Sequence, residues 1–420
     1  MIGKYSCILM LMLADLDKTD NKSLKKRLAT DINSLRSPEG YLNAGIPNYN
    51  HLFGRDACIS ALQLIDYDPD IARCTLSAMV RYQATSRGLR SEAYPGRIMH
   101  EHFPGGLREK IASLVNDTDV LRKIYILLLW RFPYYGTVDA GAWFIILLHR
   151  YFKKTGDEAF LREVWPAALA VASWLEARAT SPSTGLITYR SSYIFGLRNQ
   201  SWKDTIGSGL RPPVAAVEVQ GYYYEAYNCL IDIAFTVFAD DELAMQFNHR
   251  AKQLKAALNR RMWRERDGYF SMAVNDAKDR DDAVASNPGH LLFTGILSEA
   301  QSDAVVKRLL RDDLCTPYGI RTLSSKAKSF DVDSYQQGSV WPFDNWVIYQ
   351  GLLKTGHGAE AAKLGRKLMA AYKELDFIPE LYTVSETGKI SEHKGACKVQ
   401  AWSAGALLNI TGDEDRRQVL

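Results

Sequence analysis

The sequence predicts an all-α fold, an (α/α)6 barrel in which six helical hairpins close into a double ring. Three observations lead to this prediction. Apolar residues follow a helical period along most of the chain, strand signals are few, and about eleven or twelve helices can be counted. A linear solenoid is the alternative, but solenoids usually repeat at a fixed period of roughly 20–50 residues. No such period is found, so the closed ring is favoured.

The helices are predicted from apolar stripes with a spacing of three and four residues. One stripe runs from Ala57 to Ile65 and another from Ile71 to Val80. The segment from Ala142 to Phe152 is apolar nearly all round, as is typical of a buried helix. A short strand is predicted near residues 269–272. Further helices are predicted over residues 217–238, 243–262, 300–310, 340–353, 359–375 and 399–408.

A Thr-Gly pair recurs where three of these helices are expected to end. The pairs are Thr155-Gly156, Thr355-Gly356 and Thr411-Gly412. Glycine tolerates the positive φ that a helix C-terminus often needs. Another helix is expected to begin a few residues after each of the first two pairs, and Asp157 can cap the first of these. This order of elements is typical of repeated helical hairpins.

Composition excludes several classes of function. Lys and Arg number 52 against 48 Asp and Glu, and the charges are scattered, so no nucleic-acid-binding surface is predicted. The six cysteines are not closely spaced, which favours reduced thiols in a cytoplasmic protein. The apolar run from Cys7 to Ala14 is far shorter than the roughly 20 residues that a spanning helix needs. We expect this run to pack on the body as a strand or helix rather than to serve as a signal peptide, and we expect no membrane association.

The segments between the helices carry the candidate site residues, because loops on a rigid scaffold commonly hold function. Arg55 and Asp56 could clamp neighbouring sugar hydroxyls, or could form a helix cap and a surface ion pair. Glu101 follows His100, but no third or fourth ligand stands at useful spacing, so no metal site is predicted. Asp139 opens an apolar helix and could be its N-cap or line a pocket with its aromatic neighbours.

Two carboxylates stand out because each lies in an aromatic, non-periodic segment. Asp204 follows Trp202 and Lys203, and desolvation against a ring would raise its pKa as a general acid requires. Lys203 would oppose that shift if it pointed at the carboxylate. Glu380 has apolar neighbours on both sides and must find partners or shift its pKa, although a hydrogen bond to a helix end is the plainer interpretation. Paired carboxylates are the machinery of glycoside hydrolysis.

The order of these segments resembles the amylo-α-1,6-glucosidase domain of glycogen debranching enzymes. The resemblance covers the chain from about residue 41 onward. Each matching stretch alone is weak, but ten occur in order. They begin at Ala44, Phe53, Pro95, Tyr134, Trp202, Glu218, Ser286, Gly319, Gly338 and Pro379.

The resemblance implies a glucoamylase-like (α/α)6 domain that hydrolyses an α-glucosidic bond with inversion. Asp204 corresponds to the general acid and Glu380 to the general base. The remaining candidates would bind a small carbohydrate substrate, and neither a metal nor an organic cofactor is implied. These substrate-binding candidates are Arg55, Asp56, Glu101, Asp139, Trp202, Lys203, Gln220, Tyr222, His290 and Trp341.

The chain departs from the family pattern at three positions of one motif. Gln336, Gln337 and Phe343 stand where the family usually has His, Asn and His. The family's longer members also carry an N-terminal domain. We therefore interpret residues 1–420 as a single catalytic domain, with residues 1–40 either an N-terminal extension or the remnant of a lost domain.

These departures leave three hypotheses for the activity. The first is an inverting, exo-acting glycosidase for a short oligosaccharide or an α-1,6-linked glucoside. The second is hydrolysis of a charged small glycoside, such as a glucosyl- or mannosyl-glycerate or a uronic acid glycoside, with Arg97, Lys203 and Arg321 as cationic partners. The third is a non-catalytic sugar-binding toroid, although retention of both candidate carboxylates argues against it.

Overall fold

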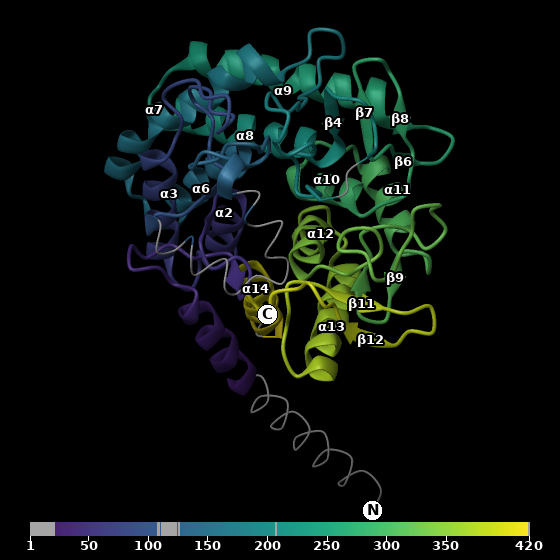
Figure 1. Cartoon of the computed structure of the whole chain (residues 1–420). Coiled ribbons are helices and arrows are strands. Elements are labelled where there is room, and N and C mark those ends of the chain that lie inside the picture. The colour runs from purple at the N-terminus through teal and green to yellow at the C-terminus, as the bar shows by residue number, and fades with distance from the viewer. Residues whose placement is uncertain (1–21, 107–109, 111–123, 125–126, 206–207, 419–420) are drawn as a thin grey trace, which may run out of the picture.

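The computed structural model describes residues 22–418 apart from 107–109, 111–123, 125–126 and 206–207. Six helices form a closed inner ring, in which each contacts the next and the last contacts the first (Figure 1). In ring order they are α2 (Gly54–Gln63), α6 (Ala140–Thr155), α8 (Val217–Thr236), α10 (Leu291–Thr294), α12 (Pro342–Lys354) and α14 (Ala401–Gln418). The predicted (α/α)6 barrel is confirmed.

The outer ring is built by the helices that alternate with the inner ones along the chain. They are α3 (Pro69–Arg81), α7 (Glu158–Trp174), α9 (Asp241–Met262), α11 (Glu299–Leu309) and α13 (Gly358–Leu375). The helical residues 22–34 supply a further outer helix. Their apolar side chains join the core, and Arg27 pairs with Asp376 at the end of α13. These residues, expected to lie in an extension, therefore pack on the body. The run from Cys7 to Ala14 lies outside the described residues.

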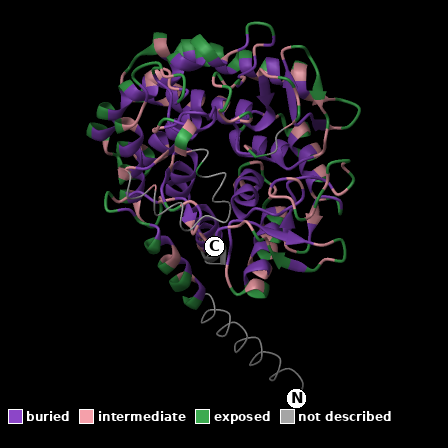
Figure 2. Ribbon diagram, viewed as in Figure 1, coloured by how far each residue is buried: buried purple, intermediate pink, exposed green. Residues whose placement is uncertain are grey.

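Burial explains the division into two rings. All ten residues of α2 are buried, and α6 and α12 are buried over most of their length. The outer helices keep one exposed face, which appears green on the rim of the molecule (Figure 2). An inner helix needs apolar residues all round, whereas an outer helix needs only one stripe.

Short antiparallel strands connect the helices. They form the pairs β1 (Gly45–Ile46) with β13 (Val399–Gln400), β2 (Leu52–Phe53) with β3 (Glu101–His102), β5 (Trp263–Arg264) with β6 (Tyr269–Phe270), β9 (Cys315–Thr316) with β10 (Gly319–Ile320), and β11 (Tyr382–Val384) with β12 (Ile390–Glu392). A three-stranded sheet has the order β4 (Val214–Ala216), β7 (Ala273–Asn275), β8 (Arg280–Asp281). A π-helical turn, Leu175–Ala179, extends α7, and a 3-10 turn, Asn287–His290, leads into α10.

Two of the three predicted helix ends are confirmed. Gly156 ends α6 with φ 69°, and Gly356 follows α12 with φ 82°. Asp157 caps α7 by accepting a hydrogen bond from the Phe160 amide. The third end is wrong, because α14 continues through Gly412 to residue 418. A Cβ at Gly412 would lie 2.1 Å from the Tyr67 hydroxyl, so this glycine makes room for a neighbouring side chain.

Two predicted helix starts also differ from the structure. Residues 340–341 precede α12, which begins at Pro342, where proline fits the first turn. Residues 399–400 pair as β13 with β1, and α14 begins only at Ala401. In the described part of the chain, no helix is long and apolar enough to cross a membrane.

Candidate active site

The candidate residues gather where the inner helices begin. Arg55 and Asp56 lie in the first turn of α2, and Asp139 directly precedes α6. His290 precedes α10, and Trp341 precedes α12. The inner helices share one direction because each is separated from the next by an outer helix that runs back. Motifs that are far apart in the sequence therefore meet at one end of the barrel, where helix N-termini favour negative charge.

Arg55 is the centre of the site. Its Nη1 donates to both carboxylate oxygens of Asp139, at 3.2 and 3.3 Å, and its Nη2 donates to Asp204 Oδ2 at 3.1 Å. Asp56 Oδ2 lies 3.8 Å from Nε. Although burial alone lowers the pKa of Arg55, the charges of Asp139, Asp204 and Asp56 raise it overall. The interpretation of Arg55 and Asp56 as a surface ion pair is wrong, because both side chains are buried.

Asp139 precedes α6 as an N-cap would, but its side chain makes no capping hydrogen bond. It is fully buried, and it accepts hydrogen bonds from Arg55 and from the Thr137 hydroxyl instead. Asp139 thus holds the guanidinium of Arg55 in place. Asp204 is about one-quarter exposed at its side chain, which makes it the accessible carboxylate of the pair.

Glu380 lies in the segment before β11. Tyr335 donates its hydroxyl to Glu380 Oε1 at 2.6 Å, and the Cys397 amide donates to Oε2 at 3.0 Å. Burial raises the pKa of Glu380 to about 8, in spite of these two hydrogen bonds. The charges of Asp56 and Asp204 also act on Glu380 and raise its pKa. The two candidate catalytic carboxylates therefore belong to one electrostatic site.

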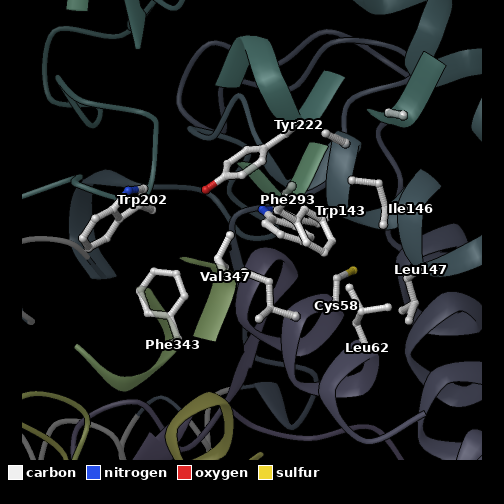
Figure 3. Close-up of a cluster of buried hydrophobic side chains, with 14 of the residues drawn as sticks. Cys58, Leu62, Trp143, Ile146, Leu147, Trp202, Tyr222, Phe293, Phe343 and Val347 are labelled. Atoms are coloured by element: carbon white, nitrogen blue, oxygen red, sulfur yellow. The ribbon is translucent and has the colours of Figure 1, made fainter. Parts of the chain in front are cut away.

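Aromatic side chains of the same motifs are buried, and Figure 3 shows Trp202, Tyr222 and Phe343 among them. Trp202 stacks on His290 with ring centroids 5.9 Å apart and meets Trp341 edge to face at 5.8 Å. The Tyr222 hydroxyl pairs with His290 Nδ1, and His290 Nε2 lies 2.7 Å from Asp344 Oδ1. All of these side chains are buried.

Three predicted substrate-binding residues use their polar groups in hydrogen bonds to other residues of the chain. Gln220 accepts a hydrogen bond from the Ile187 amide and donates to the carbonyls of Ile187 and Ala216. Glu101 lies 2.7 Å from His51 Nε2. Lys203 donates to the Thr322 carbonyl at 2.6 Å and so points away from Asp204. Burial lowers the pKa of Lys203 to about 8.

The cationic partners expected for a charged substrate are likewise occupied. Arg97 donates to the carbonyls of Thr137 and Glu92 and to the Gln200 side chain. Arg321 donates to the carbonyls of Val384 and Ser385. Together with Lys203, these cations hold the loops in place.

The structure also identifies site residues that the sequence analysis did not choose. The carboxylate of Glu218 is fully buried, and burial raises its pKa. His100 is buried among Arg55, Asp204 and Asp139, whose charges act on it. Each stands in a recognised motif, next to or near a chosen residue, but sequence order does not tell which side chain points inward.

Gln336 and Phe343, two of the departures from the family pattern, also have defined roles. Gln336 donates to the Trp202 carbonyl at 2.9 Å and accepts from the Thr205 amide at 3.1 Å, so it clamps the segment that carries Asp204. Phe343 is fully buried and stacks on Trp402 at 3.9 Å.

Comparison with known proteins supplies the family. Residues 49–395 match the family model described as mannosylglycerate hydrolase MGH1-like glycoside hydrolase domain. The chain belongs to this family. The chain is therefore a member of a glycoside hydrolase family with the six-hairpin toroid fold, as the sequence implied, but the matching family is not the amylo-α-1,6-glucosidase family.

Curated relatives match over shorter stretches. An uncharacterized protein of Borreliella burgdorferi is 25% identical over 211 residues, which are 49% of this chain and 41% of the relative. Mannosylglycerate hydrolase MGH1 of Selaginella moellendorffii is 34% identical over 86 residues, 20% of this chain and 17% of the relative. Solabiose phosphorylase of Paenibacillus borealis is 24% identical over 58% of this chain and 32% of the relative. The aligned part thus spans less than half the length of these relatives.

Solved structures share the fold. The GH63 mannosylglycerate hydrolase of Thermus thermophilus, in complex with Tris and D-glycerate, superposes with a TM-score of 0.70 at 16% identity. That match covers 93% of this chain and 100% of the other. A rhamnosidase from Klebsiella oxytoca with rhamnose bound gives a TM-score of 0.62 at 15% identity and covers 94% of this chain and 64% of the other.

Proposed function

We propose that this glycoside hydrolase cleaves the α-glycosidic bond of a small glycoside with an anionic aglycone, of the mannosyl- or glucosyl-glycerate type, with inversion at the anomeric carbon. The observation that carries the proposal is the family match over residues 49–395, which includes every residue of the charged cluster. The mannosylglycerate hydrolase structures support the choice of substrate. A short α-1,6-linked glucoside is the second candidate, because ten sequence stretches resemble the debranching family.

In the proposed mechanism Asp204 protonates the glycosidic oxygen and Glu380 activates the attacking water. An inverting pair leaves room for that water, with the two carboxyl groups about 6.5–9.5 Å apart. Arg55 and Asp56 would hold sugar hydroxyls, since a guanidinium donates and a carboxylate accepts. The two hydrogen bonds that Glu380 accepts from Tyr335 and Cys397 favour its ionised form, as a base requires.

Two electrostatic features of the site bear on the assignment of the acid and the base. Asp204 is ion-paired with Arg55, so a bound sugar hydroxyl must compete with Asp204 for this guanidinium. Glu380, with its pKa raised by burial to about 8, becomes fully ionised only at alkaline pH. A raised pKa would also suit Glu380 as the general acid, so the experiment must separate acid from base.

The test uses α-mannosylglycerate, α-glucosylglycerate and isomaltose, with α-mannosylglycerol as the uncharged match to the first. NMR identifies the anomer released first. We expect turnover of a glycerate glycoside, little turnover of mannosylglycerol, and release of the β-sugar. Faster turnover of isomaltose would select the debranching-type activity, and release of the α-anomer would exclude inversion.

Asp204→Asn and Glu380→Gln then assign the roles. General acid–base groups contribute about 10²–10⁴-fold to rate, so both variants should lose activity on the glycerate glycosides. Fluoride leaves without protonation, so the variant that lacks the acid should keep most of its activity on a glycosyl fluoride. We expect that variant to be Asp204→Asn. Retention by Glu380→Gln instead would reverse the roles.

A further inference from the structure

A cavity of about 500 Å³ lies next to segments that carry the candidate active site. Its lining residues come from the segments 87–97 and 174–200 and from Val138 and Pro213. None of Arg55, Asp56, Asp204 and Glu380 lines it. Its wall includes Val138 and Gln200, whose backbones are hydrogen-bonded to each other at 2.8 Å. The cavity and the candidate active site are therefore built on neighbouring parts of the same segments, but their functional groups differ.

Arginines dominate the charge of this cavity. Arg87, Arg178 and Arg190 line it and are exposed, and within the described residues no carboxylate forms an ion pair with any of them. Glu92 is the one carboxylate among the lining residues. It is buried and accepts hydrogen bonds from Tyr134, Gln200 and the Ser192 amide. The cavity is thus positively charged at its mouth, where a ligand would enter.

Two of these arginines are already oriented by an aromatic ring. The guanidinium of Arg87 lies 4.9 Å from the Tyr94 ring centroid, and that of Arg178 lies 4.6 Å from the same centroid. Stacking uses the face of a guanidinium and leaves N–H groups at its edge for a phosphate or carboxylate. The Arg87 side chain is held further by its hydrogen bond to the Tyr94 hydroxyl at 3.2 Å.

Aromatic side chains supply apolar surface within the cavity. Trp174 and Tyr189 line it and are largely buried, and Arg97 stacks on Trp174 at 5.2 Å. Rings with polar edges suit the apolar face of a sugar, and arginines suit its anionic substituent. A cavity of this size lies in the range of small-molecule sites.

We propose that this cavity binds an anionic sugar, a pyranose that carries a phosphate or a carboxylate group. The binding site is separate from the catalytic one and does not depend on the proposed hydrolysis. Because residues 138 and 200 are close to Asp139, Trp202 and Asp204 along the chain, the ligand would contact the reverse side of the segments that hold the catalytic cluster.

Isothermal titration of the full chain tests the proposal with glucose 6-phosphate, glucuronate, glucose and inorganic phosphate. None of these is a glycoside, so the result is independent of turnover. We expect glucose 6-phosphate or glucuronate to bind at least tenfold more tightly than glucose and than phosphate. Whichever of these two ligands binds more tightly identifies the anionic group as phosphate or carboxylate. The proposal would be overturned if neither glucose 6-phosphate nor glucuronate bound.

Three variants locate the binding. The double variant R87Q/R178Q should weaken binding at least tenfold, and both residues are exposed, so it should fold. R162Q is the matched control, because Arg162 also stacks on a ring, that of Phe238 at 4.8 Å, but lies outside the cavity. Asp56→Asn should leave binding unchanged. Loss of binding in Asp56→Asn with retention in R87Q/R178Q would place the ligand in the catalytic site and refute the second site.

Discussion

The Tyr335 hydroxyl donates a 2.6 Å hydrogen bond to Glu380 Oε1 and so ties the candidate base to the motif in which the chain departs from its resembled family. The bond stabilises the ionised form of a carboxyl group whose pKa burial raises to about 8. A base is active when ionised. Activity is therefore expected to rise with pH up to about pH 8.

Removal of the hydroxyl in Tyr335→Phe should move this ascending limb to higher pH, because the ionised form of Glu380 loses a donor and its pKa rises further. The profile of kcat/KM against pH measures the shift. Tyr269→Phe is the matched control, since its buried hydroxyl bonds the Ala285 carbonyl and not Glu380. An unchanged profile in Tyr335→Phe would exclude Glu380 as the group that titrates.

Gln336→Ala should lower kcat by roughly 10- to 100-fold with a smaller change in KM, because it releases the Trp202–Thr205 backbone and misplaces Asp204. Gln336→His should restore part of the loss, since an imidazole can donate to one backbone group and accept from the other. Gln337→Ala is the control, because no side-chain hydrogen bond of Gln337 is found in the described structure. Equal losses in both alanine variants would contradict a positioning role for Gln336.

Asp139→Asn should reduce the free energy of unfolding by about 3 kcal/mol, because the buried guanidinium of Arg55 loses its principal counter-charge. Urea unfolding of the purified protein measures the change. The matched control is Asp376→Asn, which breaks an exposed ion pair with Arg27 and should have little effect. Comparable stability of the two variants would mean that Asp56 and Asp204 suffice to neutralise Arg55.

Phe343→His, which installs the residue usual in the resembled family, should destabilise the protein by about 1–3 kcal/mol, because it buries an imidazole between Trp402 and Trp202. Phe343→Leu keeps the site apolar and should be the milder change. The midpoint of thermal unfolding, compared among the parent protein and both variants, tests this prediction. A more stable histidine variant would show that a polar partner is within reach at this position.

The helical architecture follows from local properties of the sequence. Apolar spacing sets which faces must be buried, and Gly156 and Gly356 end helices because only a residue without a Cβ adopts positive φ at low cost. The same local rule was wrong at Gly412, where a long-range contact with Tyr67 decides the role of the glycine.

The motifs that carry Asp204 and Glu380 were also evident from the sequence, since carboxylates in aromatic, non-periodic segments are conspicuous. Only the tertiary structure decided the direction and the partners of each side chain. It joined Arg55 to Asp139 and Asp204 across 84 and 149 residues of sequence, and it turned Lys203 toward a carbonyl. Burial and hydrogen bonding depend on contacts between distant segments, so the local pattern could name the candidates but could not separate those that face a substrate from those that hold the loops.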